Sequence, residues 1–130
     1  MNEVKKYTSD LLTLEITETD QEIQVTWLGK SVEREPGKFI NPILSEMLMR
    51  GKKTNKRIIL IFTSLSYMNS STIMTISKFL EKGKDGNSYI TVRYNDDRRW
   101  QKLSFNALKI FQTNDGKITF EGIRDSEEGI

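Results

Sequence analysis

The sequence contains no cysteine and no histidine. Without cysteine there is no disulfide framework and no thiol nucleophile, and without histidine the commonest general base of enzymes is missing. The same absences remove the usual ligands of transition metals and leave only carboxylates, which suit a hard cation. We therefore expect a protein that is not an enzyme and that needs no metal or cofactor.

Long apolar runs are missing as well. The N-terminus, MNEVKKYTSD, lacks the apolar core of a signal peptide. No stretch approaches the roughly 18 consecutive apolar residues that indicate a membrane span. These two absences predict a cytoplasmic protein without membrane insertion.

Neither sign of charge is in marked excess. The 20 Lys and Arg residues against 18 Asp and Glu residues leave a net charge of +2, which is too balanced to indicate a nucleic-acid partner. One basic cluster, formed by Lys52, Lys53, Lys56 and Arg57, could contact phosphates. Such clusters are more often solvated surface, so nucleic acid is not an expected partner.

The residues that are present indicate one domain of strands and helices, and 130 residues is a single-domain size. Alternating apolar residues predict half-buried strands, the unbroken run RIILIF predicts a central strand, and apolar residues at helical spacing predict helices. The expected strands are 11–19, 21–29, 57–62, 89–94 and 117–123, and the expected helices are 41–51, 70–82 and 98–112. The first helix could also begin earlier, at Glu35-Pro36, with a kink at Pro42. Asp96 or Asp97 could cap the third.

This order, ββαβαβαβ, predicts an α/β fold with a mixed β-sheet, right-handed helical crossovers between the later strands, and helices packed against the sheet. We assign residues 10–123 to this domain, residues 1–9 to an N-terminal segment and residues 124–130 to a flexible acidic tail. The functional surface of such sheets usually lies beyond the carboxyl ends of the parallel strands. The segment SYMNSSTI, at 66–73, follows the central strand at that edge.

An asparagine and three hydroxyl residues, Asn69, Ser70, Ser71 and Thr72, stand at the predicted start of the second helix. Asn69 or Ser70 can cap that helix. A serine could instead act as a nucleophile, although neither a histidine nor a G-x-S-x-G motif supports this reading. A hydroxyl could also accept a phosphate, which the free amides and positive dipole of a helix N-terminus would stabilise. Capping and phosphoacceptance are compatible in one residue.

Two segments carry a resemblance to known regulatory proteins. SLSYMNSST, at 64–72, resembles the L-x-Y-F-N-T-S-S segment of the STAS-like regulatory phosphoproteins of the SiaC type. More loosely, it resembles the M-D-S-[ST]-G segment in the STAS domains of bacterial anti-sigma-factor antagonists. LGKSVEREPGKFINPIL, at 28–44, is similar to the SiaC-type G-x-S-x-P-E-N-x-x-x-F-x-x-P-[IV] stretch that enters the first helix. The resemblance covers most of residues 10–123.

The resemblance implies a STAS-like fold and a signalling protein that is phosphorylated at Ser70, with Ser71 and Thr72 as the next candidates. It also implies a surface that binds a partner protein in the unphosphorylated form. The residues of this implied surface are Tyr67, Met68, Asn69, Ser70, Ser71, Thr72 and Met74. The implied partners are a protein serine kinase, its cognate phosphatase and a downstream effector, either an anti-sigma-type kinase or a cyclase.

The chain also departs from both patterns. Asn69 stands where the antagonists have aspartate, and Thr72 stands where they have glycine. Arg98 and Arg99 lie in a segment that is strongly acidic in the SiaC type. The class of the downstream effector therefore stays open. The main alternative is a STAS-like module that senses a small ligand or nucleotide through the same hydroxyls, and a cryptic enzyme is the third possibility.

Overall fold

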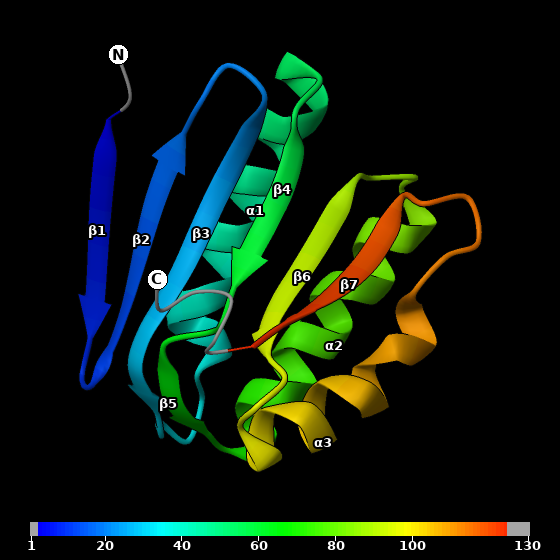
Figure 1. Ribbon diagram of the computed structural model, residues 1–130. Coiled ribbons are helices and arrows are strands. Elements are labelled where there is room, and N and C mark those ends of the chain that lie inside the picture. The colour runs from blue at the N-terminus through cyan, green and yellow to red at the C-terminus, as the bar shows by residue number, and fades with distance from the viewer. Residues whose placement is uncertain (1–2, 125–130) are drawn as a thin grey trace.

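The computed structural model describes residues 3–124, which form one β-sheet with helices packed against one face (Figure 1). The strands are β1 (Val4–Ser9), β2 (Leu12–Glu18), β3 (Glu22–Ser31), β4 (Arg57–Ile61), β5 (Leu65–Met68), β6 (Ile90–Asn95) and β7 (Ile118–Ile123). The helices are α1 (Gly37–Thr54), α2 (Ser70–Asp85) and α3 (Arg99–Leu108), and the 3₁₀ turn η1 (Lys109–Phe111) follows α3. No helix within the described residues is long and apolar enough to cross a membrane.

The sheet is mixed, which confirms the predicted α/β class. Its strand order is β1-β2-β3-β4-β6-β7, and β5 pairs with β3 beyond the end of β4. The first three strands are antiparallel neighbours, whereas β4 is parallel to β3, and β6 and β7 continue in that direction. Parallel neighbours require crossover connections, and α1, α2 and α3 supply them. The carboxyl ends of the parallel strands therefore meet at one end of the molecule.

Two strands were not predicted. Residues 4–9, placed in the N-terminal segment, form β1 and pair with β2 along their whole length. Strand β5 has only four residues and joins β3 where the register of β3 shifts between Gly29 and Lys30. Gly29 has a φ of +88°, and a Cβ atom there would lie 2.1 Å from the carbonyl oxygen of Leu11, so only glycine fits. Residues 125–130 of the predicted acidic tail lie outside the described residues.

The three predicted helices are present, but α1 ends at Thr54 instead of 51, α2 at Asp85 instead of 82, and α3 at Leu108 instead of 112. Helix α1 begins at Gly37, directly after Pro36, so the earlier of the two expected starts is the observed one and Pro42 lies inside the helix. The prediction that Asp96 or Asp97 caps α3 is wrong, because Arg98 occupies the cap position and makes no side-chain bond there. A carboxylate oxygen of Asp96 instead lies 3.9 Å from Nε of Arg124.

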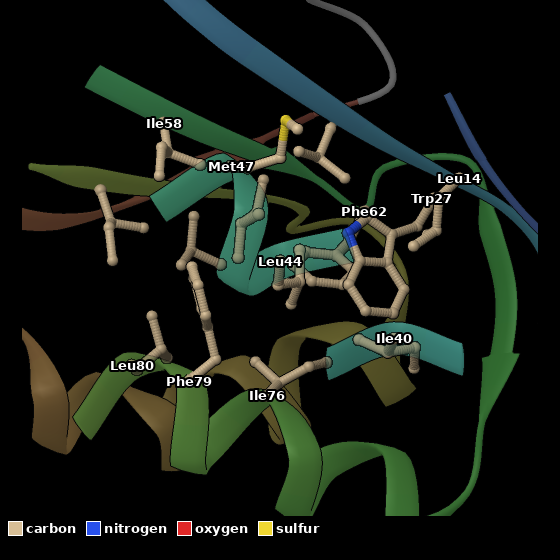
Figure 2. Close-up of a cluster of buried hydrophobic side chains, with 14 of the residues drawn as sticks. Leu14, Trp27, Ile40, Leu44, Met47, Ile58, Phe62, Ile76, Phe79 and Leu80 are labelled. Carbon is tan, nitrogen blue, oxygen red and sulfur yellow. The ribbon is translucent and has the colours of Figure 1, made fainter. Parts of the chain in front are cut away.

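A single apolar core holds the helices on the sheet, and Figure 2 shows its centre. Trp27 of β3 is fully buried, and its ring centroid lies 4.7 Å from that of Phe62. Ile40 and Ile76, from the first halves of α1 and α2, are also fully buried in this cluster. Burial of each such side chain stabilises the fold by about 1.5–3 kcal/mol. Because Ile40 and Ile76 belong to the same cluster, their packing fixes the two helix N-termini relative to each other.

Candidate functional site

The start of α2 is built by the side chain of Asn69. This residue follows β5 in an extended conformation, and its side-chain oxygen accepts hydrogen bonds from the backbone N–H of Thr72 at 2.9 Å and from the Thr72 hydroxyl at 2.8 Å. A polar side chain at this position satisfies one of the free amides of the first turn. The predicted cap is therefore confirmed, and the capping residue is Asn69.

The same asparagine ties α2 to the loop that precedes α1. Its amide group donates to the carbonyl oxygen of Glu33 at 2.9 Å, and its backbone N–H donates to the carbonyl oxygen of Ser31 at 3.0 Å. The hydroxyls of Ser31 and Thr72, both buried, lie 2.6 Å apart. These bonds fix the loop of residues 31–36 against the first turn of α2.

The residues expected to form the site are split between surface and interior. Tyr67, Ser70, Ser71 and Met74 are exposed, with Tyr67 at 48% and Met74 at 57%. Asn69 is half-buried. Met68 and Thr72 are buried, so their side chains support the surface from beneath and are not presented to a partner. Four of the seven expected residues are thus brought together on the outside of the molecule.

An open groove of about 380 Å³ lies beside Ser70. Helices α1 and α2 both begin at the end of the molecule where β5 lies (Figure 1), and the groove runs between the two starts. From α2 it is lined by Ser70, Ser71, Met74, Thr75 and Lys78, and from the α1 side by Arg34, Glu35, Pro36, Gly37 and Asn41. The exposed hydroxyls therefore open onto a surface that two helices share.

The groove has a positive electrostatic character. Neither α1 nor α2 carries an acidic side chain in its first turn, where such a side chain would offset the positive end of the helix dipole. Arg34 and Lys78 add two full charges, and within residues 3–124 neither forms an ion pair. Glu35 supplies a carboxylate, but it lies 2.8 Å from Nζ of Lys38. An anion bound here would meet two cations and the positive ends of two helix dipoles.

Arg34, Asn41 and Lys78 were missed as site residues by the sequence reasoning, although signals for them exist. Arg34 and Asn41 lie inside the 28–44 segment that carries the family resemblance. Lys78 is seven residues after Ser71 and four after Met74, which places all three on one face of a helix. The sequence alone does not predict that this face of α2 meets the start of α1 across a groove, because that depends on how α1 and α2 pack.

The basic cluster at 52–57 lies at the opposite end of the molecule, and part of it makes contacts within the protein. Arg57 donates to the carbonyl oxygens of Gly116 and Lys117, at 3.0 and 3.1 Å, and to the hydroxyl of Thr91. Lys56 contacts Glu18 with an Nζ–Oε2 distance of 2.6 Å. Two of the four residues of this cluster are therefore engaged within the protein.

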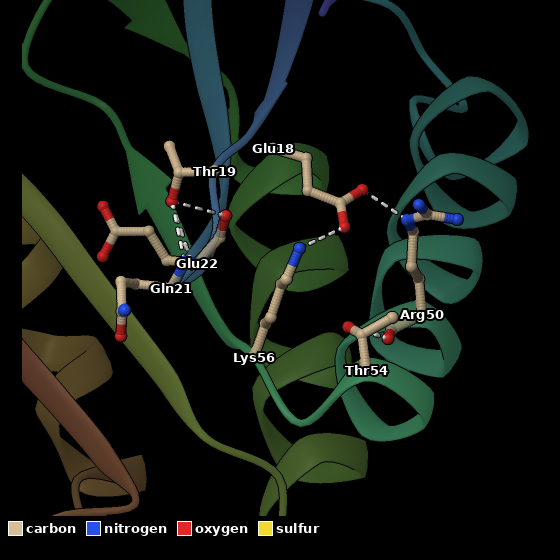
Figure 3. Close-up of polar contacts among 7 residues, drawn as sticks. All are labelled: Glu18, Thr19, Gln21, Glu22, Arg50, Thr54 and Lys56. Atoms are coloured by element: carbon tan, nitrogen blue, oxygen red, sulfur yellow. Dashed lines mark hydrogen bonds and ion pairs between the residues drawn. The ribbon is translucent and has the colours of Figure 1, made fainter. Parts of the chain in front are cut away.

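Glu18 holds that opposite end together, as Figure 3 shows. Its carboxylate accepts hydrogen bonds from Arg50 of α1 and from Lys56 before β4. These two cations, Arg50 first, lower the pKa of Glu18 below its ordinary value of 4.5. The ion pairs join the end of β2 to α1 and to the start of β4, which is a structural role.

The described residues contain no group of three or more His, Cys, Asp or Glu side chains that could hold a metal ion. Among known proteins, no family model and no curated protein matches the sequence. The fold is similar to that of SiaC of Pseudomonas aeruginosa, with a TM-score of 0.60 and 14% sequence identity over 94% of this chain and 98% of that chain. The chain therefore has a SiaC-like fold.

Proposed function

We propose that this protein is a non-enzymatic cytoplasmic signalling regulator that binds a partner protein and is switched by phosphorylation of Ser70. The observation that carries the proposal is the position of Ser70. It is exposed at the first residue of α2 and opens onto a groove that Arg34 and Lys78 make positive. A phosphate formed at such a place is stabilised where it is made.

Accessibility favours Ser70 over its neighbour Thr72. A kinase must reach the acceptor hydroxyl, and the Thr72 hydroxyl is buried between Asn69 and Ser31. Ser71 is exposed and lines the same groove, which makes it the next candidate. In the SiaC-type resemblance of residues 64–72, Ser70 matches the phosphorylated hydroxyl. The similarity of the fold to that of SiaC supports this comparison. In this proposal Thr72 supports the start of α2 and is not the phosphorylated residue.

The partner surface in this proposal surrounds Ser70 on the outside of α2. Tyr67, three residues before Ser70, and Met74, four residues after it, offer exposed apolar area, and aromatic residues and methionine are enriched in binding surfaces. An acidic group of the partner would enter the groove and meet Arg34, Lys78 and the two helix N-termini. Binding would thus combine an apolar contact with the neutralisation of a positive groove.

Phosphorylation would release the partner for two physical reasons. The phosphate adds about 1.5–2 negative charges and occupies the positive groove from within, so an acidic group of the partner loses its site. A like-charge pair at roughly 4 Å also costs on the order of 4 kcal/mol at an effective dielectric near 20. Half of that cost weakens binding by more than tenfold.

The proposal requires a protein serine kinase, a cognate phosphatase and a downstream effector. The resemblance to the SiaC type and to anti-sigma-factor antagonists points to a cyclase or an anti-sigma-type kinase as the effector. Affinity capture from the native cell, with and without phosphatase treatment, would identify it.

Site mapping tests the proposal first. The purified protein is incubated with extract of the native cell and ATP, and its intact mass and phosphopeptides are measured. We expect one phosphate on Ser70, its loss in Ser70→Ala and its retention in the matched variant Ser71→Ala. Phosphate on Thr63, Ser64 or Ser88, or unchanged labelling of Ser70→Ala, would refute the assignment.

The second candidate function is a module that senses a small anion or a nucleotide. The same groove favours it, because Arg34, Lys78 and the helix N-termini could hold a free oxyanion without any covalent step. A thermal-shift screen with nucleotides and inorganic phosphate tests it. Stabilisation that Arg34→Gln removes, together with an unmodified mass after incubation with extract, would favour the sensor over the phosphoswitch.

A further inference from the structure

The outer face of α3 and η1 carries an apolar stripe that the core does not use. Leu103 is 62% exposed, Ile110 is 76% exposed, and Ala107 lies exposed between them. The three residues are spaced by four and three positions, so they follow one line along the helix. The opposite face of the same segment is buried, because Phe105 and Leu108 pack into the core. The segment is therefore apolar on two faces, and only one of them is covered within residues 3–124.

The segment that carries this stripe has charges of one sign. Residues 98–112 contain four cations, Arg98, Arg99, Lys102 and Lys109, and no carboxylate, in a chain whose net charge is only +2. All four are exposed. Arg99 continues the line of the stripe by one turn, while Lys102 and Lys109 lie along one side of it at helical spacing. Lys109 is held in place over the ring of Tyr94, 5.5 Å from its centroid.

We propose that Leu103, Ala107 and Ile110 dock an amphipathic helix of a protein partner, whose apolar seam is flanked by Asp and Glu side chains. Spacings of four and three residues match the seam of a helix pair, in which apolar side chains interlock along a single line. The basic flank selects an acidic partner by charge complementarity. This surface does not depend on Ser70 or on its modification, so it is a second contact site of the protein.

Two other occupants fit the stripe less well. A second copy of this chain would place the four cations of residues 98–109 against the same four of the other copy, and that like-charge contact opposes association. A membrane surface takes up a broad apolar face with a basic rim. The broad face of α3 already packs on the sheet, and what remains outside is one line of side chains about 10 Å long.

The test uses the full chain, isotope-labelled for NMR, and two synthetic helical peptides of three heptads. Both peptides have the same leucine seam, but one has glutamate flanks and the other has lysine flanks. We expect the glutamate peptide to bind at micromolar concentration, the lysine peptide to bind at least tenfold more weakly, and the shifted resonances to lie in residues 98–111. Leu103→Gln combined with Ile110→Gln should weaken binding of the glutamate peptide at least tenfold.

Met49→Gln is the matched control, because Met49 is an apolar side chain on α1 that is 72% exposed. Unlike the stripe, it has charged residues of both signs near it in the sequence, Glu46 and Arg50. It should leave binding unchanged, and melting curves check that every variant is folded. Absence of binding at millimolar glutamate peptide, shifts centred on α1, or an equal loss in Met49→Gln would overturn the proposal. It is also overturned if the peptide leaves α3 unshifted while anionic vesicles bind through Leu103 and Ile110, which would assign the stripe to a membrane surface.

Discussion

The two ends of the sheet use the same cationic residue types in opposite ways. At the end where α1 and α2 finish, Arg57 is bonded to two backbone carbonyls, and Arg50 and Lys56 are paired with Glu18. At the end where both helices begin, Arg34 and Lys78 line an open groove beside two exposed serines. Within the described residues neither of these two cations forms an ion pair.

This difference shows that the role of a cation depends on which charged and polar groups lie near it. Cations near helix C-termini compensate the negative end of the dipole and stabilise the fold. Cations near helix N-termini add to a positive potential that already exists, so they favour the folded protein only when an anion joins them. We therefore interpret the Glu18 end as structural and the Ser70 end as prepared for a negative charge.

The largest expected effect on stability is that of Arg57→Met, and Arg34→Met at the other end of the sheet is its comparison. Arg57→Met should lower the free energy of unfolding by about 2–3 kcal/mol, because charged hydrogen bonds to half-buried carbonyls are lost. Arg34→Met should change it by less than about 0.5 kcal/mol. Urea unfolding followed by tryptophan fluorescence measures both. Equal losses would remove the distinction between the two ends.

Asn69→Ala tests how the Ser70 end is held together. The variant should lose about 2 kcal/mol, since the cap of α2 and the bond to the Glu33 carbonyl disappear together. Asn41→Ala, in the same groove but exposed, is the control and should lose less than about 0.5 kcal/mol. If both variants keep wild-type stability in thermal unfolding, the loop of residues 31–36 is not anchored through Asn69.

Glu18 makes the opposite end sensitive to acid. Its pKa is lower in the folded than in the unfolded protein, so its contribution is complete above the ordinary value of 4.5 and is lost as the pH falls through the folded value. Glu18→Gln should therefore cost about 1 kcal/mol at pH 7 and progressively less below pH 4.5. Urea unfolding across this pH range, with exposed Glu81→Gln as control, checks the sign. A difference from wild type that grows toward acid would contradict it.

The smallest expected effect is that of Ser70→Ala on stability. Because Asn69 provides the cap, removal of the Ser70 hydroxyl should change the free energy of unfolding by less than about 0.5 kcal/mol. Thermal unfolding next to Asn69→Ala gives the comparison directly. A loss as large as that of Asn69→Ala would mean that Ser70 serves the fold.

Much of the fold could be predicted from local signals in the sequence. The unbroken apolar run at 57–62 predicted the central strand, and the Asn-Ser-Ser-Thr cluster placed the start of α2 at Ser70, where it is. Strand β1 carries no such signal, because all of its residues except Ser9 are exposed and its apolar residues do not alternate. Strand β5 is too short to show a period and depends on the bend of β3 at Gly29.

The candidate site was predictable only in part, for a related reason. Residue types predicted the hydroxyl cluster and its place at a helix start, but burial divides that cluster, with Ser70 outside and Thr72 inside. Helical period places Thr72 on the face that packs inward, which the sequence could have indicated. The contribution of Arg34 comes from a loop that Asn69 ties to α2 across 36 residues of chain, and no local pattern encodes that contact.

The affinity of the captured effector for the protein before and after phosphorylation tests the central claim most directly. Binding is measured for unphosphorylated wild type, for wild type phosphorylated on Ser70 and for Ser70→Ala, with the stoichiometry of phosphate verified by intact mass. The account predicts equal, tight binding of unphosphorylated wild type and Ser70→Ala, and at least tenfold weaker binding of the phosphorylated form. Tighter binding of the phosphorylated form would contradict it, and would mean that the effector grips the phosphate with its own cations.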